Sequence, residues 1–300
     1  MKLEIKKITK KFKKKTAVNN FSMELQAGKC VGLIGPNGAG KSTIIKIISD
    51  IIDPSIGEVL LDGKQISKMK REIGYLPQYP NFFQWMTAKE TLAFMGQLSG
   101  MTKLELIDVI PELLSKVGLN GEENSKVETF SGGMKQRLGI AQALLHEPSL
   151  IVMDEPVSAL DPIGRREVLN IIQEIKKKTT ILLSTHILSD AEEICERFVI
   201  IKKGHKIADT TLTELLNRNS ENKVKCEIKG RCEEWIENIK HLNYVKGLEI
   251  VGNKLKIELE DIELHKNMLL ANALEYQVDL VRFEIGTDTL EEKFLSLVGE

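Results

Sequence analysis

The sequence has little of what marks membrane-spanning, secreted or disulfide-stabilised proteins. Of its 300 residues only 8 are proline, 4 are cysteine and 5% are aromatic. No uninterrupted apolar run approaches the roughly 20 residues that a membrane-spanning helix needs. The N-terminus also lacks the charged segment, apolar segment and cleavage site of a secretion signal. We therefore expect a chain that does not itself span a membrane.

The few cysteines argue for a reducing compartment. Cys30, Cys195, Cys226 and Cys232 show no CxxC spacing, so reduced structural thiols in a cytosol are the default interpretation. A metal site built on the last two would need histidines at ligand spacing, and none lies there. We expect a cytoplasmic protein.

Charge is balanced rather than one-sided. The formal net charge is −1, so no global field attracts the chain to nucleic acid or to an anionic membrane, and we expect no nucleic-acid partner. The local exception is a lysine cluster, Lys10, Lys11, Lys13, Lys14 and Lys15. No interleaved aromatics or basic helix accompany it, which favours a solvated hairpin turn over a polyanion site.

The first two-thirds of the chain alternates between strand and helix patterns. Such alternation predicts an α/β fold around a mostly parallel sheet, preceded by an antiparallel hairpin over residues 2–8 and Ala17–Leu25. The segment 87–117 looks helical, with breaks near Ser99-Gly100 and at Pro111. The other predicted strands are Cys30–Ile34, Gly57–Leu61, Ile73–Leu76, Leu150–Asp154, Thr180–Ser184 and the hairpin Phe198–Ala208; the other helices are Lys41–Asp50, Met134–His146, Gly164–Lys177 and Ile187–Cys195.

The last third changes character. A polar stretch over 218–222 predicts a linker between a domain over 1–217 and a small accessory domain over 223–300. The accessory segment has the order strand 223–228, helix 231–240, strands 247–251 and 254–260, helix 262–275 and strand 278–284. This β-α-β-β-α-β order predicts a ferredoxin-like α+β domain. A final amphipathic segment, Thr289–Leu297, is expected to be helical.

A phosphate-binding loop follows the strand Cys30–Ile34 and opens a helix. Its glycines allow backbone N–H groups to point at a β-phosphate, and the helix N-terminus adds partial positive charge. Lys41 can bridge β- and γ-phosphate oxygens, the Ser42 hydroxyl can ligate Mg²⁺, and Thr43 lies on the α-phosphate side. The whole loop is Gly35, Pro36, Asn37, Gly38, Ala39, Gly40, Lys41, Ser42 and Thr43. This Walker A pattern, with its strand and helix in place, predicts ATP and Mg²⁺ as ligands.

A second acidic motif ends an apolar run. Asp154 and Glu155 follow the buried strand Leu150–Asp154, at the edge where α/β proteins form their sites. Asp154 is expected to hold the magnesium, and Glu155 to act as the general base for the water that attacks the γ-phosphate. Without other motifs, this pair would indicate only a strand that ends at the solvent. Together with the phosphate-binding loop, it predicts hydrolysis of ATP.

Further motifs, in this order, make the chain resemble the ATP-binding cassette (ABC) family. They are Tyr75-Leu76-Pro77-Gln78, Phe130-Ser131-Gly132-Gly133-Met134-Lys135-Gln136-Arg137, Ser158-Ala159-Leu160-Asp161 and Ser184-Thr185-His186. The resemblance covers about residues 1–217. It implies a P-loop ATPase domain with a RecA-like core, an antiparallel β-subdomain and a helical subdomain.

The resemblance also implies roles. Gln78 would offer its side-chain oxygen to magnesium and to the attacking water, and His186 would contact the γ-phosphate. Ser131, Gly132, Gly133 and Asp161 would complete the nucleotide site of a second subunit, which implies a homodimer or pairing with a similar ATPase. Phe12 resembles the aromatic that stacks on adenine, with Val18 beside it, although Lys13 replaces the glycine often found next. Taken singly, Gln78 could cap a loop, and His186 could begin a helix.

Phe130 and Met134 depart from the commonest Leu-Ser-Gly-Gly-Gln form of the second turn. This variant, the accessory domain and the ending Leu290-Glu-Glu-Lys-Phe-Leu-Ser-Leu-Val-Gly299 are similar to the ATPases of bacterial drug, bacteriocin and sodium exporters, which are separate chains. The resemblance therefore implies an ATP hydrolase at the inner face of the cell membrane, coupled to a separate transmembrane permease.

Three alternatives remain open from the sequence. The chain could be a soluble ABC ATPase that acts on ribosomes, DNA or iron–sulfur assembly, although it has one cassette and no long heptad insertion. It could be a non-hydrolysing regulator, which the presence of Glu155 and His186 disfavours. The segment Tyr79–Gln97, with Phe82, Phe83, Trp85 and Met86, could either present a groove to the permease or pack the core of the helical subdomain.

Overall fold

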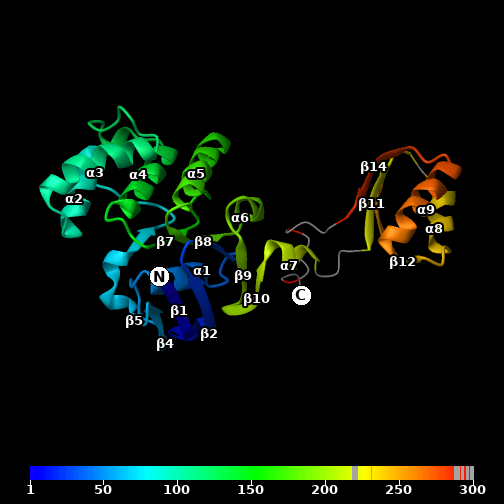
Figure 1. Ribbon diagram of the computed structural model, residues 1–300, viewed down its shortest axis with the longest axis horizontal. Coiled ribbons are helices and arrows are strands. Elements are labelled where there is room, and N and C mark those ends of the chain that lie inside the picture. The colour runs from blue at the N-terminus through cyan, green and yellow to red at the C-terminus, as the bar shows by residue number, and fades with distance from the viewer. Residues whose placement is uncertain (218–221, 231, 287–290, 292–293, 295–296, 298–300) are drawn as a thin grey trace. The chain divides into compact units, whose positions relative to one another are not determined.

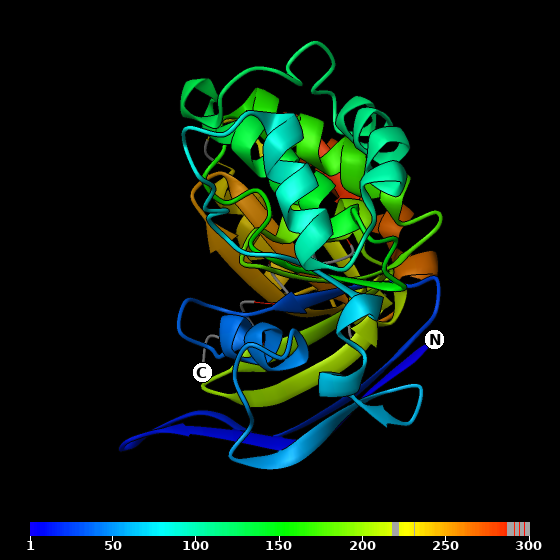
Figure 2. The same ribbon diagram turned by 90° about the vertical axis from the view of Figure 1, so that its left-hand side faces the viewer.

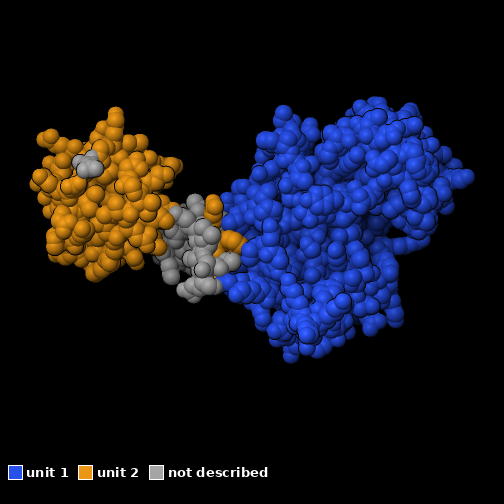
Figure 3. All heavy atoms as spheres, turned by 180° about the vertical axis from the view of Figure 1, so that it is seen from behind, with its two compact units in different colours: residues 1–211 blue, residues 212–300 orange. Residues whose placement is uncertain are grey.

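The computed structural model describes residues 1–217, 222–230, 232–286, 291, 294 and 297. It divides into two units, residues 1–211 and 212–300 (Figure 3). Helix α7 (Leu212–Asn217) begins the second unit, so this division falls six residues before the predicted boundary. Nearly all of the predicted linker and most of the predicted final helix Thr289–Leu297 lie outside the described residues.

The first unit is built on a six-stranded sheet with the order β10-β9-β3-β8-β7-β6. Strands β3, β6, β7, β8 and β9 are parallel, and β10 pairs antiparallel with β9 at one edge. Every residue of β3, β7 and β8 is buried, as expected where helices cover both faces of a parallel sheet. The strands are β3 (Cys30–Ile34), β6 (Ile73–Leu76), β7 (Leu150–Asp154), β8 (Thr180–Thr185), β9 (Arg197–Lys202) and β10 (His205–Thr211).

A second, antiparallel sheet has the order β2-β1-β4-β5. Helix α1 (Lys41–Ile48) lies between the two sheets (Figures 1 and 2), and its isoleucines share one core with both. The predicted hairpin is confirmed, and the lysine cluster lies at its exposed end. The strands are β1 (Lys2–Phe12), β2 (Lys15–Gln26), β4 (Ile56–Leu61) and β5 (Lys64–Gln65).

The helices α2 (Ala88–Leu98), α3 (Lys103–Lys116) and α4 (Gly132–Leu144) form the helical part above the central sheet (Figure 1). Thr87 and Thr102 begin α2 and α3 with capping boxes, and the predicted break near Ser99-Gly100 separates them. The predicted break at Pro111 is wrong, because α3 runs through it. Pro111 is exposed, while Ile110 and its apolar neighbours are buried on the other face, so packing holds the helix despite the missing backbone bond.

Two more helices complete this unit: α5 (Pro162–Ile175) and α6 (Leu188–Ile194). Each begins shortly after a predicted site residue, α5 after Asp161 and α6 after His186. None of the helices in the described residues combines the length and apolar character that crossing a membrane requires.

The second unit contains a four-stranded antiparallel sheet with the order β12-β13-β11-β14. Helices α8 and α9 share a core with the sheet, centred on the buried Trp235. This chain order and strand order are compatible with the predicted ferredoxin-like arrangement. The elements are β11 (Lys223–Ile228), α8 (Glu233–Lys240), β12 (Val245–Val251), β13 (Lys254–Leu259), α9 (Ile262–Glu275) and β14 (Leu280–Ile285).

Candidate nucleotide site

The phosphate-binding loop joins the buried strand β3 to helix α1, and its glycines are required by close backbone contacts. A Cβ atom at Gly35 would lie 2.3 Å from the carbonyl oxygen of Ile201. Gly40 has φ +110°, and a Cβ there would lie 2.6 Å from the carbonyl oxygen of Ala17. A side chain would clash at both positions, and the φ of Gly40 is one that other residues rarely adopt. The glycines therefore give the loop this shape and leave its N–H groups at the start of α1.

Lys41 is the first residue of α1, and its side chain is buried. Its Nζ donates to the carbonyl oxygen of Gly35 at 2.7 Å and to that of Pro36 at 3.3 Å. It also lies 3.3 Å from Oε1 of Glu155, whose side chain is 7% exposed. The ammonium is therefore fixed inside the loop, between backbone dipoles and one carboxylate.

Glu155 links the loop to the histidine after β8. Its other oxygen, Oε2, lies 2.6 Å from Nδ1 of His186. Glu155 has φ +49°, an unusual conformation for a residue with a side chain. Its backbone N–H donates to Oγ of Ser184, 3.1 Å away on the neighbouring strand. This left-handed backbone conformation at the strand end turns the carboxylate toward Lys41 and His186, and such strain is typical of functional positions.

Hard oxygen ligands gather beside this carboxylate. Oδ1 of the buried Asp154 accepts hydrogen bonds from Oγ of Ser42 at 3.1 Å and from Oγ of Ser184 at 2.6 Å. Burial, and next the charge of Asp154, raise the pKa of the Tyr75 phenol to about 12, so Tyr75 stays neutral. A carboxylate and a hydroxyl beside a phosphate loop are suited to Mg²⁺.

One cavity of about 530 Å³ is lined by Lys41, Ser42, Glu155 and His186, while Asp154 lies behind Ser42 and does not line it. Phe12 reaches it from the hairpin, and Gln78 reaches it from the loop after β6. Val18 is fully buried, and its Cγ2 would lie 3.4 Å from a Cβ at Gly40, so it supports the loop from below. The lining is Phe12, Lys15, Ala17, Asn37, Gly38, Ala39, Gly40, Lys41, Ser42, Thr43, Gln78, Tyr79, Glu155, Ser158 and His186.

The structure does not bring the second glycine turn into this cavity. Ser131 caps α4 by accepting from the N–H of Met134 at 3.2 Å, and Asp161 caps α5 by accepting from that of Gly164 at 3.3 Å. A Cβ at Gly133 would lie 3.8 Å from Cα of Gly164, so the two helix starts adjoin. Ser131, Gly132 and Asp161 are exposed, and Gly133 is partly exposed. Two capped helix starts thus face outward together, separately from the phosphate loop.

Three contributors to the site were not predicted individually. Ser184 holds both acidic residues, Ser158 lies 3.4 Å from Nε2 of Gln78, and Lys15 lines the cavity beside Phe12. Ser184 could have been found from the sequence, because it ends the predicted strand Thr180–Ser184, and in the parallel register it lies level with Asp154. The hydrogen bond of Ser158 depends on the tertiary path of two loops and has no local signal.

The aromatic segment after Gln78 is largely at the surface. Phe83 and Trp85 are 53% and 63% exposed, and Tyr79 is 63% exposed. The ring of Phe83 lies 5.8 Å from that of Trp85 and 5.9 Å from that of Phe94, measured between centroids. Phe82 and Met86 are half-buried. Of the two alternatives from the sequence, the structure favours a surface cluster over a packed core.

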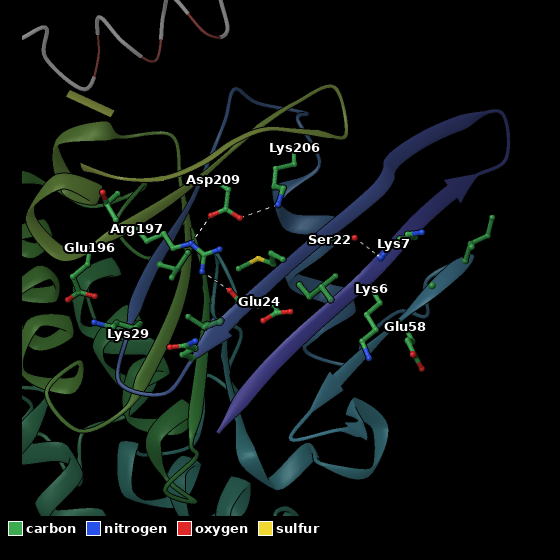
Figure 4. Close-up of a pocket in the computed structure, with 18 residues that line it drawn as sticks. Lys6, Lys7, Ser22, Glu24, Lys29, Glu58, Glu196, Arg197, Lys206 and Asp209 are labelled. Atoms are coloured by element: carbon green, nitrogen blue, oxygen red, sulfur yellow. Dashed lines mark hydrogen bonds and ion pairs between the residues drawn. The ribbon is translucent and has the colours of Figure 1, made fainter. Parts of the chain in front are cut away.

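A larger cavity, of about 1310 Å³, lies elsewhere, between the hairpin strands and β9–β10 (Figure 4). Three of its charged side chains bind one another. Arg197 Nε donates to Asp209 Oδ1 at 2.6 Å, and Lys206 Nζ lies 3.1 Å from Oδ2 of the same carboxylate. Arg197 also donates to the carbonyl oxygen of Glu24 at 2.6 Å. The smaller cavity, with its phosphate loop and acidic strand end, is the one equipped for nucleotide chemistry.

Fold and cavity together define a P-loop nucleotide-binding ATPase. A family profile for "ABC transporter" matches residues 18–158. The chain is 40% identical to the uncharacterized ABC transporter ATP-binding protein YxlF of Bacillus subtilis, over 99% of both chains. It is 34% identical to the linearmycin resistance ATP-binding protein LnrL of the same species, over 99% of this chain and 98% of that one. It is 32% identical to a Nod factor export ATP-binding protein I of Rhizobium, over 99% and 97%.

Solved structures agree with these sequence relatives. An ATP-binding subunit of an ABC transporter superposes with a TM-score of 0.65 at 34% identity, over 72% of this chain and 92% of that one. The dimeric cassette MJ0796, bound to ADP and phosphate after hydrolysis, gives a TM-score of 0.64 at 28% identity, over 70% and 98%. The chain belongs to the ABC transporter family, as one of its ATP-binding, ATP-hydrolysing subunits.

Proposed function

We propose that this chain powers export through a separate membrane permease, by closing and reopening a dimer around ATP. The contact of one buried glutamate with both Lys41 and His186 carries the hydrolytic half of this proposal. The full-length similarity to proteins named for Nod factor export and linearmycin resistance supports the export half. The protein would work at the inner face of the cell membrane, in the cytoplasm.

In the bound state, the phosphate loop and Lys41 hold the β- and γ-phosphates, while Phe12 stacks on the adenine. Glu155 accepts a proton from the water that attacks the γ-phosphate, and His186 orients that carboxylate and contacts the γ-phosphate. Asp154, Ser42 and Gln78 would hold Mg²⁺, which neutralises phosphate charge when bound. The acceptor oxygen of Asp154, already shared by two hydroxyl groups, fits this ion.

A second copy, or a similar ATPase, completes the site. The exposed starts of α4 and α5 present Ser131, Gly133 and Asp161 outward, where they would meet the γ-phosphate held by the other chain. A helix N-terminus favours an anion, which gives the second turn a physical reason to close on ATP. Hydrolysis removes the γ-phosphate and with it the attraction that holds the two chains together.

The exposed aromatic cluster Tyr79, Phe83, Trp85 and Phe94 would bind a cytoplasmic segment of the permease. Tyr79 follows Gln78 directly, and Phe83 and Trp85 lie on the same loop, so a change at the γ-phosphate would reach the cluster through this loop. Aromatic residues are enriched at the energetic centres of protein interfaces, and Phe83 of this cluster contacts both Trp85 and Phe94. We also retain the predicted boundaries, a cassette over 1–217 and an accessory domain over 223–300, as part of this proposal.

Purification of the tagged chain from native membranes tests the whole proposal. We expect a membrane protein with several spanning helices to copurify and to raise the ATPase rate when the two are reconstituted, with no such rise for Glu155→Gln. Association with ribosomes or DNA in place of a membrane protein would contradict transport. Failure to hydrolyse ATP, with or without a partner, would instead indicate an ATP-binding regulator.

A further inference from the structure

An ion pair joins the helix behind Asp161 to the helix behind His186. Arg165 lies in the first turn of α5, and Asp190 lies in the first turn of α6. Nε of Arg165 donates to Oδ1 of Asp190 at 2.8 Å, and Nη2 contacts the same oxygen. Nη2 also donates to Oγ of Ser189 at 3.1 Å. The guanidinium group therefore binds two successive residues at the start of α6, Ser189 and Asp190.

Within the described residues, Asp190 forms its one ion pair with Arg165. Its side chain is 5% exposed, and within the part of the chain that the structure describes, its Oδ2 has no hydrogen-bond partner. Burial raises the pKa of Asp190, and the hydrogen bond from Arg165 opposes that rise. A buried carboxylate that loses its cation destabilises the fold. We therefore expect a shift of α5 that moves Arg165 to move α6 as well.

About one helical turn separates each residue of this ion pair from a predicted site residue. On one side, the N–H of Arg165 donates to the carbonyl oxygen of Asp161 at 2.9 Å, so the pair is one helical turn from the cap. On the other side, Asp190 lies four residues, about one helical turn, beyond His186. His186 in turn lies against Glu155 at 2.6 Å. A continuous path therefore runs from the outward-facing Asp161 to the buried general base.

A neighbouring pair provides a comparison. Arg166 and Glu193 join the same two helices, with Nη1 and Oε1 2.6 Å apart. Their side chains are 61% and 30% exposed, and Glu193 also accepts from Nε2 of Gln173 at 2.8 Å. Glu193 lies almost one turn farther from His186. An exposed pair of this kind contributes little to stability and can lose one partner cheaply.

We propose that Arg165 and Asp190 are positioning residues that set His186 against Glu155 according to the position of Asp161. The inference rests on the proposed function, in which Asp161 faces the nucleotide of the second subunit. When the other chain closes, Asp161 and the start of α5 move, and Arg165 carries α6 and His186 with them. ATP hydrolysis in one site would thus depend on the fit of the partner, although neither Arg165 nor Asp190 touches the nucleotide.

The test compares Arg165→Met with Arg166→Met in the full chain, by steady-state ATPase kinetics and thermal unfolding. For Arg165→Met we expect kcat to fall by about 10- to 100-fold, since small misplacements of catalytic groups have effects of that size. We expect KM for ATP to change little, and the unfolding temperature to fall because the buried Asp190 loses its cation. The kinetics are therefore measured well below that temperature. Arg166→Met should behave as the unaltered protein does. Arg165→Lys, which keeps the charge and one donor, should recover part of kcat.

A double-mutant cycle separates positioning from simple bracing. Because Asp161 acts through Arg165 in our proposal, Asp161→Ala combined with Arg165→Met should lower kcat no further than the more damaging single change. Additive losses, or equal losses for Arg165→Met and Arg166→Met, would overturn the proposal. If Arg165→Met does not fold, Asp190→Asn takes its place in the cycle. An unaltered protein without ATPase activity would contradict the proposed function itself, and not this coupling.

Discussion

Nδ1 of His186 lies 2.6 Å from Oε2 of Glu155, and the other oxygen of that carboxylate lies 3.3 Å from Nζ of Lys41. One buried carboxylate thus touches both residues that are expected to hold the γ-phosphate. An arriving phosphate competes with Glu155 for Lys41, which frees the carboxylate to bind a water molecule. Binding of ATP and preparation of the base are therefore linked through a single side chain.

The first prediction concerns this carboxylate. Glu155→Gln keeps the shape of the side chain but removes its basicity, so we expect ATP turnover to fall by about 100-fold or more. ATP binding should persist, and the variant should accumulate as an ATP-dependent dimer. ATPase assays and light scattering check both effects. Glu192→Gln, an exposed change on α6, is the matched control and should leave turnover unchanged.

The second prediction concerns the ammonium. Lys41→Arg keeps the charge but places a planar fork where two backbone carbonyl groups enclose a point charge, so nucleotide affinity should fall by about 10-fold or more. Titration with a fluorescent ATP analogue measures this loss. Lys46→Arg, the same change at an exposed position of α1, should bind as the unaltered protein does. Equal affinities for both variants would argue against a phosphate role for Lys41.

The third prediction concerns the adenine. Phe12 is 47% exposed at the edge of the cavity. Removing its ring in Phe12→Ala should raise KM for ATP by about 5- to 30-fold with little change in kcat, the size of one stacking interaction. Phe12→Tyr keeps the ring and should keep the affinity. A fall in kcat at unchanged KM would show that Phe12 does not bind the base.

The fourth prediction concerns the permease surface. Trp85→Ser should abolish copurification with the membrane partner and leave the ATPase activity of the isolated chain unchanged, because Trp85 does not line the nucleotide cavity. Val251→Ser removes a similarly exposed apolar side chain from the second unit and should keep the partner bound. Loss of partner in both variants, or in neither, would contradict a docking role for the aromatic cluster.

The fifth prediction concerns pH and the large cavity. Burial acts to raise the pKa of Asp209, but hydrogen bonds from Arg197 and Lys206 outweigh it and lower that pKa below the usual 3.8. A carboxyl group with a lowered folded pKa stabilises the fold above its unfolded pKa and loses that effect as pH falls. Asp209→Asn should therefore reduce the free energy of unfolding at pH 7, and the deficit should shrink below about pH 4. Urea unfolding at both pH values measures it.

The motifs that could be predicted lie at the ends of buried strands. The apolar run that ends in Asp154 and the glycines after Ile34 determine local structure strongly. The strand, loop and helix that they predict therefore lie where the pattern indicates. Pro111 shows the limit of such local evidence, because the apolar face of α3 outweighs a single missing hydrogen bond. The contacts of Ser158 and Arg165 depend on how distant loops and helices meet. No periodic pattern in the sequence predicts these contacts.

Mixing two inactive variants tests the central claim, that one chain supplies the phosphate loop and another the second turn. Lys41→Ala destroys the loop but keeps Ser131, while Ser131→Arg blocks the turn but keeps Lys41; each should be inactive alone. If the site is shared between chains, an equal mixture should recover up to about a quarter of the unaltered ATPase activity, because random pairing leaves one intact site in each mixed dimer. A mixture as inactive as its components would contradict the shared site.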